Sequence, residues 1–101
     1  MSAETVFDAL GDPTRRQILQ ALSSGAQPVG ELAHRLPVRR PAVSKHLRIL
    51  EGAGLVSYET AGTRHLYALA PDGYVAAQQW FVETWDTVLD AFAAHINQEE
   101  S

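Results

Sequence analysis

Residues 36–50 read LPVRRPAVSKHLRIL, and the spacing of their apolar and basic residues is the clearest pattern in the chain. In a helix that begins at about Arg40, the apolar residues Val43, Leu47 and Leu50 fall at positions i, i+4 and i+7 and form one buried face. The polar and basic residues outside this face, which can bond phosphates or base edges, are Arg39, Arg40, Ser44, Lys45, His46 and Arg48. Polar groups gathered on the first turns of an amphipathic helix are typical of a recognition helix in a DNA major groove.

The segment before this helix predicts a second, shorter helix. Pro28 opens it, and it ends at Leu36 because the residue before Pro37 avoids the helical region. The recognition helix then continues to Gly52 or Gly54. Two short helices joined by a tight turn indicate a helix-turn-helix over residues 28–53.

The flanking segments complete a winged form of this motif. Residues 3–10 form a short amphipathic helix, and Asp12-Pro13 starts another helix that runs to about residue 23. Residues 55–69 contain two strand-like runs around a turn at residues 61–63, which indicates a β-hairpin, or wing. Residues 73–97 form one long helix. The expected fold is therefore α+β and mainly α, with five helices and a two-stranded wing.

The last helix carries more apolar surface than a domain of this size can cover. Together with the first helix, it predicts a homodimer in which residues 3–10 and 73–97 form the interface. The residues expected there are Val6, Phe7, Leu10, Phe81, Trp85, Val88, Leu89 and Phe92. The alternative is that this helix folds back onto its own domain.

Composition sets the wider limits. With 101 residues the chain is expected to form a single domain, residues 1–101, and its lack of cysteine excludes disulfides and thiolate metal sites. We find no apolar run of membrane-spanning length and no basic-then-apolar leader, so we expect no membrane partner and a cytoplasmic location.

Charge is divided between the two ends of the sequence. The net charge is −4, yet residues 32–50 hold five Lys or Arg and no acid. Residues 65–101 hold six acids and no Lys or Arg. This distribution favours double-stranded DNA as the partner of the helix-turn-helix.

Several short motifs, in this order, resemble the ArsR-type winged-helix repressors. They are Asp12-Pro13-Thr14-Arg15-Arg16 with Ile18-Leu19, Gly30-Glu31-Leu32-Ala33, Pro41-Ala42-Val43-Ser44-Lys45-His46-Leu47-Arg48-Ile49-Leu50, Ala53-Gly54-Leu55-Val56, and Gly62-Thr63-Arg64-His65-Leu66-Tyr67-Ala68-Leu69. The resemblance covers roughly residues 6–70. The aromatic last helix is more similar to the subgroup without recognised metal sites.

The resemblance implies a homodimeric transcription factor, usually a repressor, with dimer contacts from the first and last helices. Carried over by position, Ser44, Lys45 and His46 face DNA, with Arg40 and Pro41 at the start of the helix. Arg64 reaches from the wing into a flanking minor groove. Arg39 stands where the family often has a Ser or Thr cap, so it is expected to contact phosphate or to leave the helix start frayed. Arg15 and Arg16 are expected to form structural ion pairs.

Two alternative functions stay open. The first is a metal- or small-molecule-responsive sensor of the same fold. Metal sensors of the family use recognition-helix cysteines, absent here, or carboxylates and histidines on the last helix. The residues of this kind are Glu83, Asp86, Asp90, His95 and Glu99. With one histidine they indicate an acidic solvated face rather than a zinc or nickel site, so no metal or cofactor is expected and any effector stays unknown.

The second alternative is a protein-interaction module that has lost DNA binding, for which the acidic net charge is the main support. An enzyme is not expected, because no nucleophile is paired with a base and no glycine-rich phosphate loop is present. Ser44 and His46 lie two positions apart on one helix, so their side chains diverge.

Overall fold

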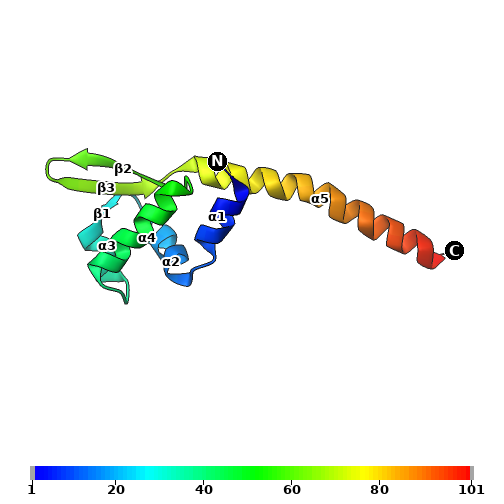
Figure 1. Cartoon of the computed structure of the whole chain (residues 1–101), viewed down its shortest axis with the longest axis horizontal. Helices are drawn as coiled ribbons and strands as arrows, with labels where there is room; N and C mark the ends of the chain where they lie inside the picture. Colours follow the sequence, from blue (N-terminus) through cyan, green and yellow to red (C-terminus); the bar gives the residue numbers. More distant parts are fainter. Residues whose placement is uncertain (1, 101) are drawn as a thin grey trace.

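The computed structural model describes residues 2–100, and the side chains of residues 2–98. Its helices are α1 (Ala3–Leu10), α2 (Pro13–Leu22), α3 (Val29–Arg35), α4 (Arg40–Gly52) and α5 (Pro71–Glu100). Its strands are β1 (Gln27–Pro28), β2 (Val56–Ala61) and β3 (Arg64–Leu69). Helices α1 to α4 and the sheet form one compact body, and α5 extends from it as a long arm (Figure 1). The molecule is accordingly elongated, with extents of 68 × 24 × 21 Å.

The predicted helix-turn-helix and wing are confirmed, with three changes in detail. The sheet has three strands in the order β1-β3-β2, because Gln27 and Pro28 pair with Tyr67 and Leu66 of β3. Pro28 therefore belongs to β1 and occupies the N-cap position of α3, without a side-chain capping hydrogen bond. The helix itself begins at Val29. The last helix begins at Pro71 and continues to Glu100, beyond the predicted bounds of 73 and 97.

Local signals explain where the elements begin and turn. The Asp12 carboxylate accepts hydrogen bonds from the main-chain N–H groups of Thr14 (2.8 Å) and Arg15 (3.2 Å), so it caps α2 as predicted. These hydrogen bonds, the one from Arg15 foremost, lower the pKa of Asp12. The wing turns over Gly62 and Thr63, and Gly62 has φ +64°, which glycine adopts without steric cost.

The core lies where α1 to α4 meet the base of the wing. Its fully buried members include Val6, Ile18, Leu32, Val43, Leu47, Leu50 and Leu55. Val6 was expected at the dimer interface, and this placement is a correction. It is 0% exposed because α1 packs with that side against its own domain, so it has no surface left for a partner. Phe7 and Leu10 of the same helix are half-buried.

Gly73 fixes the start of α5 against the body. Its N–H donates to the Gly54 carbonyl at 2.8 Å, and a Cβ at this position would lie 2.5 Å from the Ala53 carbonyl oxygen and 2.9 Å from Cδ2 of Leu55. The Ala53 oxygen and the Gly54 carbonyl carbon, 3.0 Å from this Cβ, are backbone atoms, so a side chain would push α5 away from the turn that follows α4. Only glycine allows this close approach.

We expect Gly73→Ala to lower the free energy of unfolding by about 2 kcal/mol, through overpacking at this contact. Gly52→Ala is the matched control, since a Cβ there meets nothing within 4 Å, and we expect it to be neutral or slightly stabilising. Urea unfolding at equal protein concentration measures both. Equal stabilities of the two variants would contradict the role given to Gly73.

Candidate DNA-binding surface

Helix α4 is built as the sequence predicted. Val43, Leu47 and Leu50 are each 0% exposed and hold one side of the helix in the core. This fixes the rotation of α4 about its own axis, so the remaining side chains are presented to the surface. Arg39, Arg40, Pro41, Lys45 and Arg48 are exposed, and Ser44 and His46 are half-buried.

The start of α4 has no side-chain cap. Arg39 occupies the cap position without a capping hydrogen bond, which confirms the departure noted in the sequence. Its carbonyl still accepts from the N–H groups of Ala42 (3.0 Å) and Val43 (3.1 Å), so the first turn is formed. Pro41 lies within that turn, where its missing N–H leaves no helical hydrogen bond unmade.

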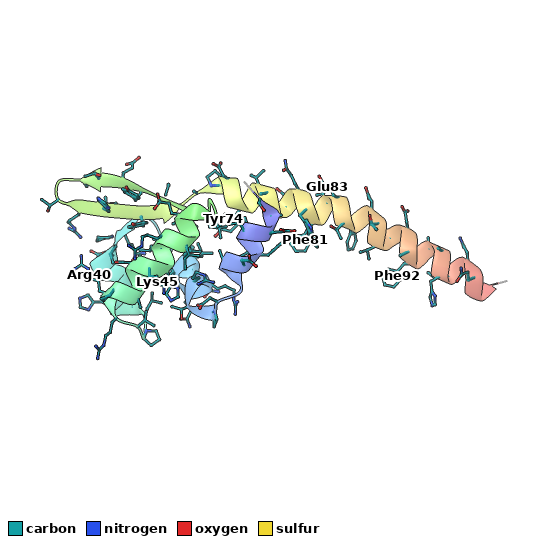
Figure 2. All side chains as sticks on the ribbon, in the orientation of Figure 1. Arg40, Lys45, Tyr74, Phe81, Glu83 and Phe92 are labelled. Atoms are coloured by element: carbon teal, nitrogen blue, oxygen red, sulfur yellow. The ribbon has the colours of Figure 1, made fainter. Side chains whose placement is uncertain are left out.

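The basic side chains of α4 differ in their surroundings. Lys45 and Arg40 lie along α4 with Arg40 nearer the helix start (Figure 2). A Cβ on Gly30 would lie 3.8 Å from Nη1 of Arg40, so this guanidinium leans over α3. Arg48 lies one turn further along α4 than Lys45. Burial raises the pKa of Tyr67 on β3, and the positive charge of Arg48 acts in the opposite direction.

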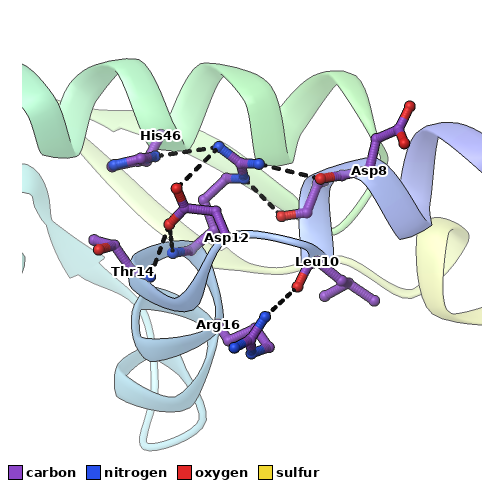
Figure 3. Close-up of polar contacts among 8 residues, drawn as sticks. Asp8, Leu10, Asp12, Thr14, Arg16 and His46 are labelled. Carbon is purple, nitrogen blue, oxygen red and sulfur yellow. Dashed lines mark hydrogen bonds and ion pairs between the residues drawn. The ribbon is translucent and has the colours of Figure 1, made fainter.

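His46 faces inward toward α2 rather than standing free on the surface. Its Nδ1 lies 3.5 Å from Nη1 of Arg15 (Figure 3). The other groups of Arg15 bond the end of α1: Nε donates to the Ala9 carbonyl at 2.6 Å and Nη2 to the Asp8 carbonyl at 3.1 Å. Arg15 therefore joins α1, α2 and α4.

Arg15 and Arg16 were expected to form ion pairs, but most of their contacts are hydrogen bonds to main-chain carbonyls. Arg15 has one ion pair, with the Asp12 carboxylate at 3.9 Å, and its shorter contacts are hydrogen bonds to main-chain carbonyls. Arg16 donates from Nη1 to the Leu10 carbonyl at 2.7 Å. Guanidinium groups here donate to carbonyls in the last turn of α1, and no sequence pattern specifies these contacts.

Arg64 is the first residue of β3, beside the wing turn. Its Nη2 lies 3.8 Å from Oε1 of Glu31 on α3, and both side chains are about three-fifths exposed, at 61% and 62%.

The wing turn, α3 and the start of α4 line a cleft of about 590 Å³. The charged and polar residues that line it are Glu31, His34, Arg40, Thr63, Arg64 and His65. Sequence reasoning placed Arg40 and Arg64 at the interface but missed Glu31, His34 and His65.

The acidic side chains of α5 do not form a metal site in the part of the chain whose side chains are described. No three His, Asp or Glu residues among them gather closely enough to hold an ion. Glu99, which shared a predicted face with His95, lies outside these described side chains. Among the same residues, no helix is both long enough and apolar enough to cross a membrane.

Comparison with known proteins identifies the family. The family of bacterial regulatory proteins named arsR matches residues 12–58. The HTH-type transcriptional regulator Rv2034 of Mycobacterium tuberculosis is 44% identical over 98 residues, which are 97% of this chain and 92% of the relative. The chain belongs to the ArsR family.

Two further proteins resemble the chain. The transcriptional repressor SdpR of Bacillus subtilis is 39% identical over 64 residues, covering 63% of this chain and 71% of the repressor. The solution structure of a homodimeric winged helix-turn-helix DNA-binding domain from Mycobacterium bovis, a possible ArsR-family regulator, has a TM-score of 0.66 and 29% identity. It covers 91% of this chain and 82% of that one. The chain is therefore a winged helix-turn-helix transcriptional regulator rather than an enzyme.

Proposed function

We propose that this ArsR-family protein is a homodimeric repressor that binds a pseudo-palindromic operator. The observation that carries the proposal is α4, whose apolar face is fully buried while its basic residues are exposed. Two such helices in a dimer would enter successive major grooves, about 34–36 Å apart. Occupying a promoter in this way would block transcription, and the protein would act in the cytoplasm.

The contacts proposed for each residue follow from its position. Lys45 and Arg39 are exposed cations suited to backbone phosphates, and Ser44 to a phosphate or a base edge. Arg40 and Arg64 border the cleft beside the wing, and Pro41 shapes the first turn of α4. We place His46 and Arg48 at the edge of the contact, since His46 lies against Arg15 and Arg48 is one turn further from the helix start than Lys45.

The dimer is proposed from α5. Phe81, Trp85, Val88, Leu89 and Phe92 are all exposed in the single chain. Beyond its contact with α1, helix α5 leaves the body as a long arm (Figure 1). At the base of that arm, Phe7 meets Trp80 and Phe81 edge to face, with ring centroids 5.2 and 5.7 Å apart. Phe7 and Leu10 would border an interface formed mainly by α5.

Binding to DNA from upstream of the protein's own gene, against a scrambled duplex, tests the proposal. Fluorescence anisotropy at two salt concentrations should show tight binding that prefers the native duplex and weakens steeply with salt. Equal, weak binding to both duplexes would contradict self-regulation through a nearby operator. It would favour a protein-interaction module if a wider operator search also failed.

We expect Lys45→Ala to weaken operator binding by about tenfold and to reduce the slope of log K against log salt by about 2. The reason is that two protomers would each lose one phosphate contact. Arg35→Ala is the matched control, because it removes one positive charge near the end of α3, outside the proposed contact set. An unchanged salt slope for Lys45→Ala would remove Lys45 from the interface.

A further inference from the structure

The cleft beside the wing has an unusual feature for a surface that meets DNA, because it contains a carboxylate. Arg40 and Arg64 line it together with His34 and His65, and Glu31 is the only acid among its lining residues. Such a set of groups attracts anions, and in a DNA-binding domain the available anions are backbone phosphates. The Glu31 carboxylate is an anion of the protein itself, and it lies in the cleft to which these groups would attract a phosphate.

Glu31 engages the one strong cation of the wing. Arg64 is the only Lys or Arg in residues 55–69, and its Nη2 is 3.8 Å from the Glu31 carboxylate. The pair joins two elements that are far apart in sequence, the first turn of α3 and the start of β3. It therefore links the wing to α3 of the body by one exposed contact.

The ion pair between Glu31 and Arg64 is weak enough for another anion to replace the carboxylate. Its distance exceeds the 2.7–2.9 Å or so of a strong charge-assisted hydrogen bond, and both side chains are more than half exposed. Exposed pairs of this kind change an equilibrium constant by at most about fivefold. A phosphate with oxygens in the plane of the guanidinium can replace the carboxylate with a paired contact.

We propose that Glu31 is an intramolecular competitor for the DNA phosphate at the wing. It holds Arg64 in the free protein and releases it when a backbone phosphate takes its place. This inference rests on the proposed operator binding and concerns its strength. Since every duplex offers phosphates, Glu31 would lower affinity for specific and non-specific DNA by the same factor. The regulator would then dissociate from DNA more readily without losing its preference for the operator.

The test is a double-mutant cycle on Glu31 and Arg64. Glu31→Gln should tighten binding to the operator and to a scrambled duplex alike, by about 2- to 5-fold for each protomer engaged. In an Arg64→Gln background, the same change should have no effect. Glu59→Gln, on the exposed side of β2 in the same hairpin, is the matched control and should give a smaller gain that persists in that background.

The cycle separates competition from plain repulsion between Glu31 and DNA. A gain from Glu31→Gln that survives in the Arg64→Gln background would overturn the proposal, as would no gain at all. The NMR signal of the Arg64 Nε–H group, recorded without DNA, should shift in Glu31→Gln and stay unchanged in Glu59→Gln. If the wild-type protein bound neither duplex while this signal shifted, the ion pair would be real but the proposed function, and the competition with it, would be refuted.

Discussion

Replacing Trp85 and Phe92 together by glutamate is expected to convert the dimer into monomers and to weaken operator binding by at least about a thousandfold. The two residues lie seven positions apart on one face of α5 and are 61% and 62% exposed in the single chain. Four rings that each bury about 100 Å² of apolar surface would stabilise a dimer by about 10 kcal/mol before the entropy of association is subtracted. A monomer holds one half-site and loses about half of the binding free energy.

A second double variant controls for added charge on the helix. Thr87→Glu with Ala94→Glu has the same spacing and the same charge on the opposite face of α5, and it should stay dimeric. Sedimentation equilibrium gives the oligomeric state, and anisotropy gives the affinity. A Trp85/Phe92 double variant that remained dimeric would refute α5 as the interface. Far-ultraviolet circular dichroism is expected to show that both variants keep the helices of the body, since the distal part of α5 lies away from the core (Figure 1).

Arg15→Ala is expected to lower the free energy of unfolding by about 3 kcal/mol. The side chain is 15% exposed and donates to the Ala9 and Asp8 carbonyls. Without the guanidinium, the Asp8 carbonyl keeps the Gly11 N–H as a partner, and the Ala9 carbonyl loses the shorter of the two bonds. Hydrogen bonds from a charged group contribute about 1.5–3 kcal/mol each, and the part-buried Ala9 carbonyl that loses this donor adds to the loss. Arg15→Lys should recover little, because one ammonium cannot reach both carbonyls in the plane that the guanidinium spans.

Arg16→Ala provides the comparison, since Arg16 is exposed and makes a single bond to the Leu10 carbonyl (Figure 3). We expect its loss to be at most about 1 kcal/mol. Urea unfolding at a fixed protein concentration measures both variants, because stability of a dimer depends on concentration. Equal losses would show that the links from Arg15 to α1 and α4 add nothing beyond an ordinary surface contact.

Several elements were predictable because their causes are local. The three-four spacing of Val43, Leu47 and Leu50 defines both the helical state of α4 and its buried side. Asp12 before Pro13 starts α2 through its own side chain, and Gly62 supplies the positive φ of the wing turn. The exposed members of the proposed DNA-binding set that lie on α4 follow directly from that face assignment.

The rest depended on which segments meet in space. Strand β1 has two residues, too few for any alternating pattern, and exists only because β3 offers its edge. Val6 turned inward because α1 packs on its own domain, a choice that apolar periodicity alone leaves open between core and partner. The same holds for the partners of Arg15 and for the pairing of Glu31 with Arg64. Sequence determined the local conformation and the buried faces, because propensity and periodicity act over a few residues. The tertiary structure decided which charged groups face one another, because those distances depend on how the elements are packed.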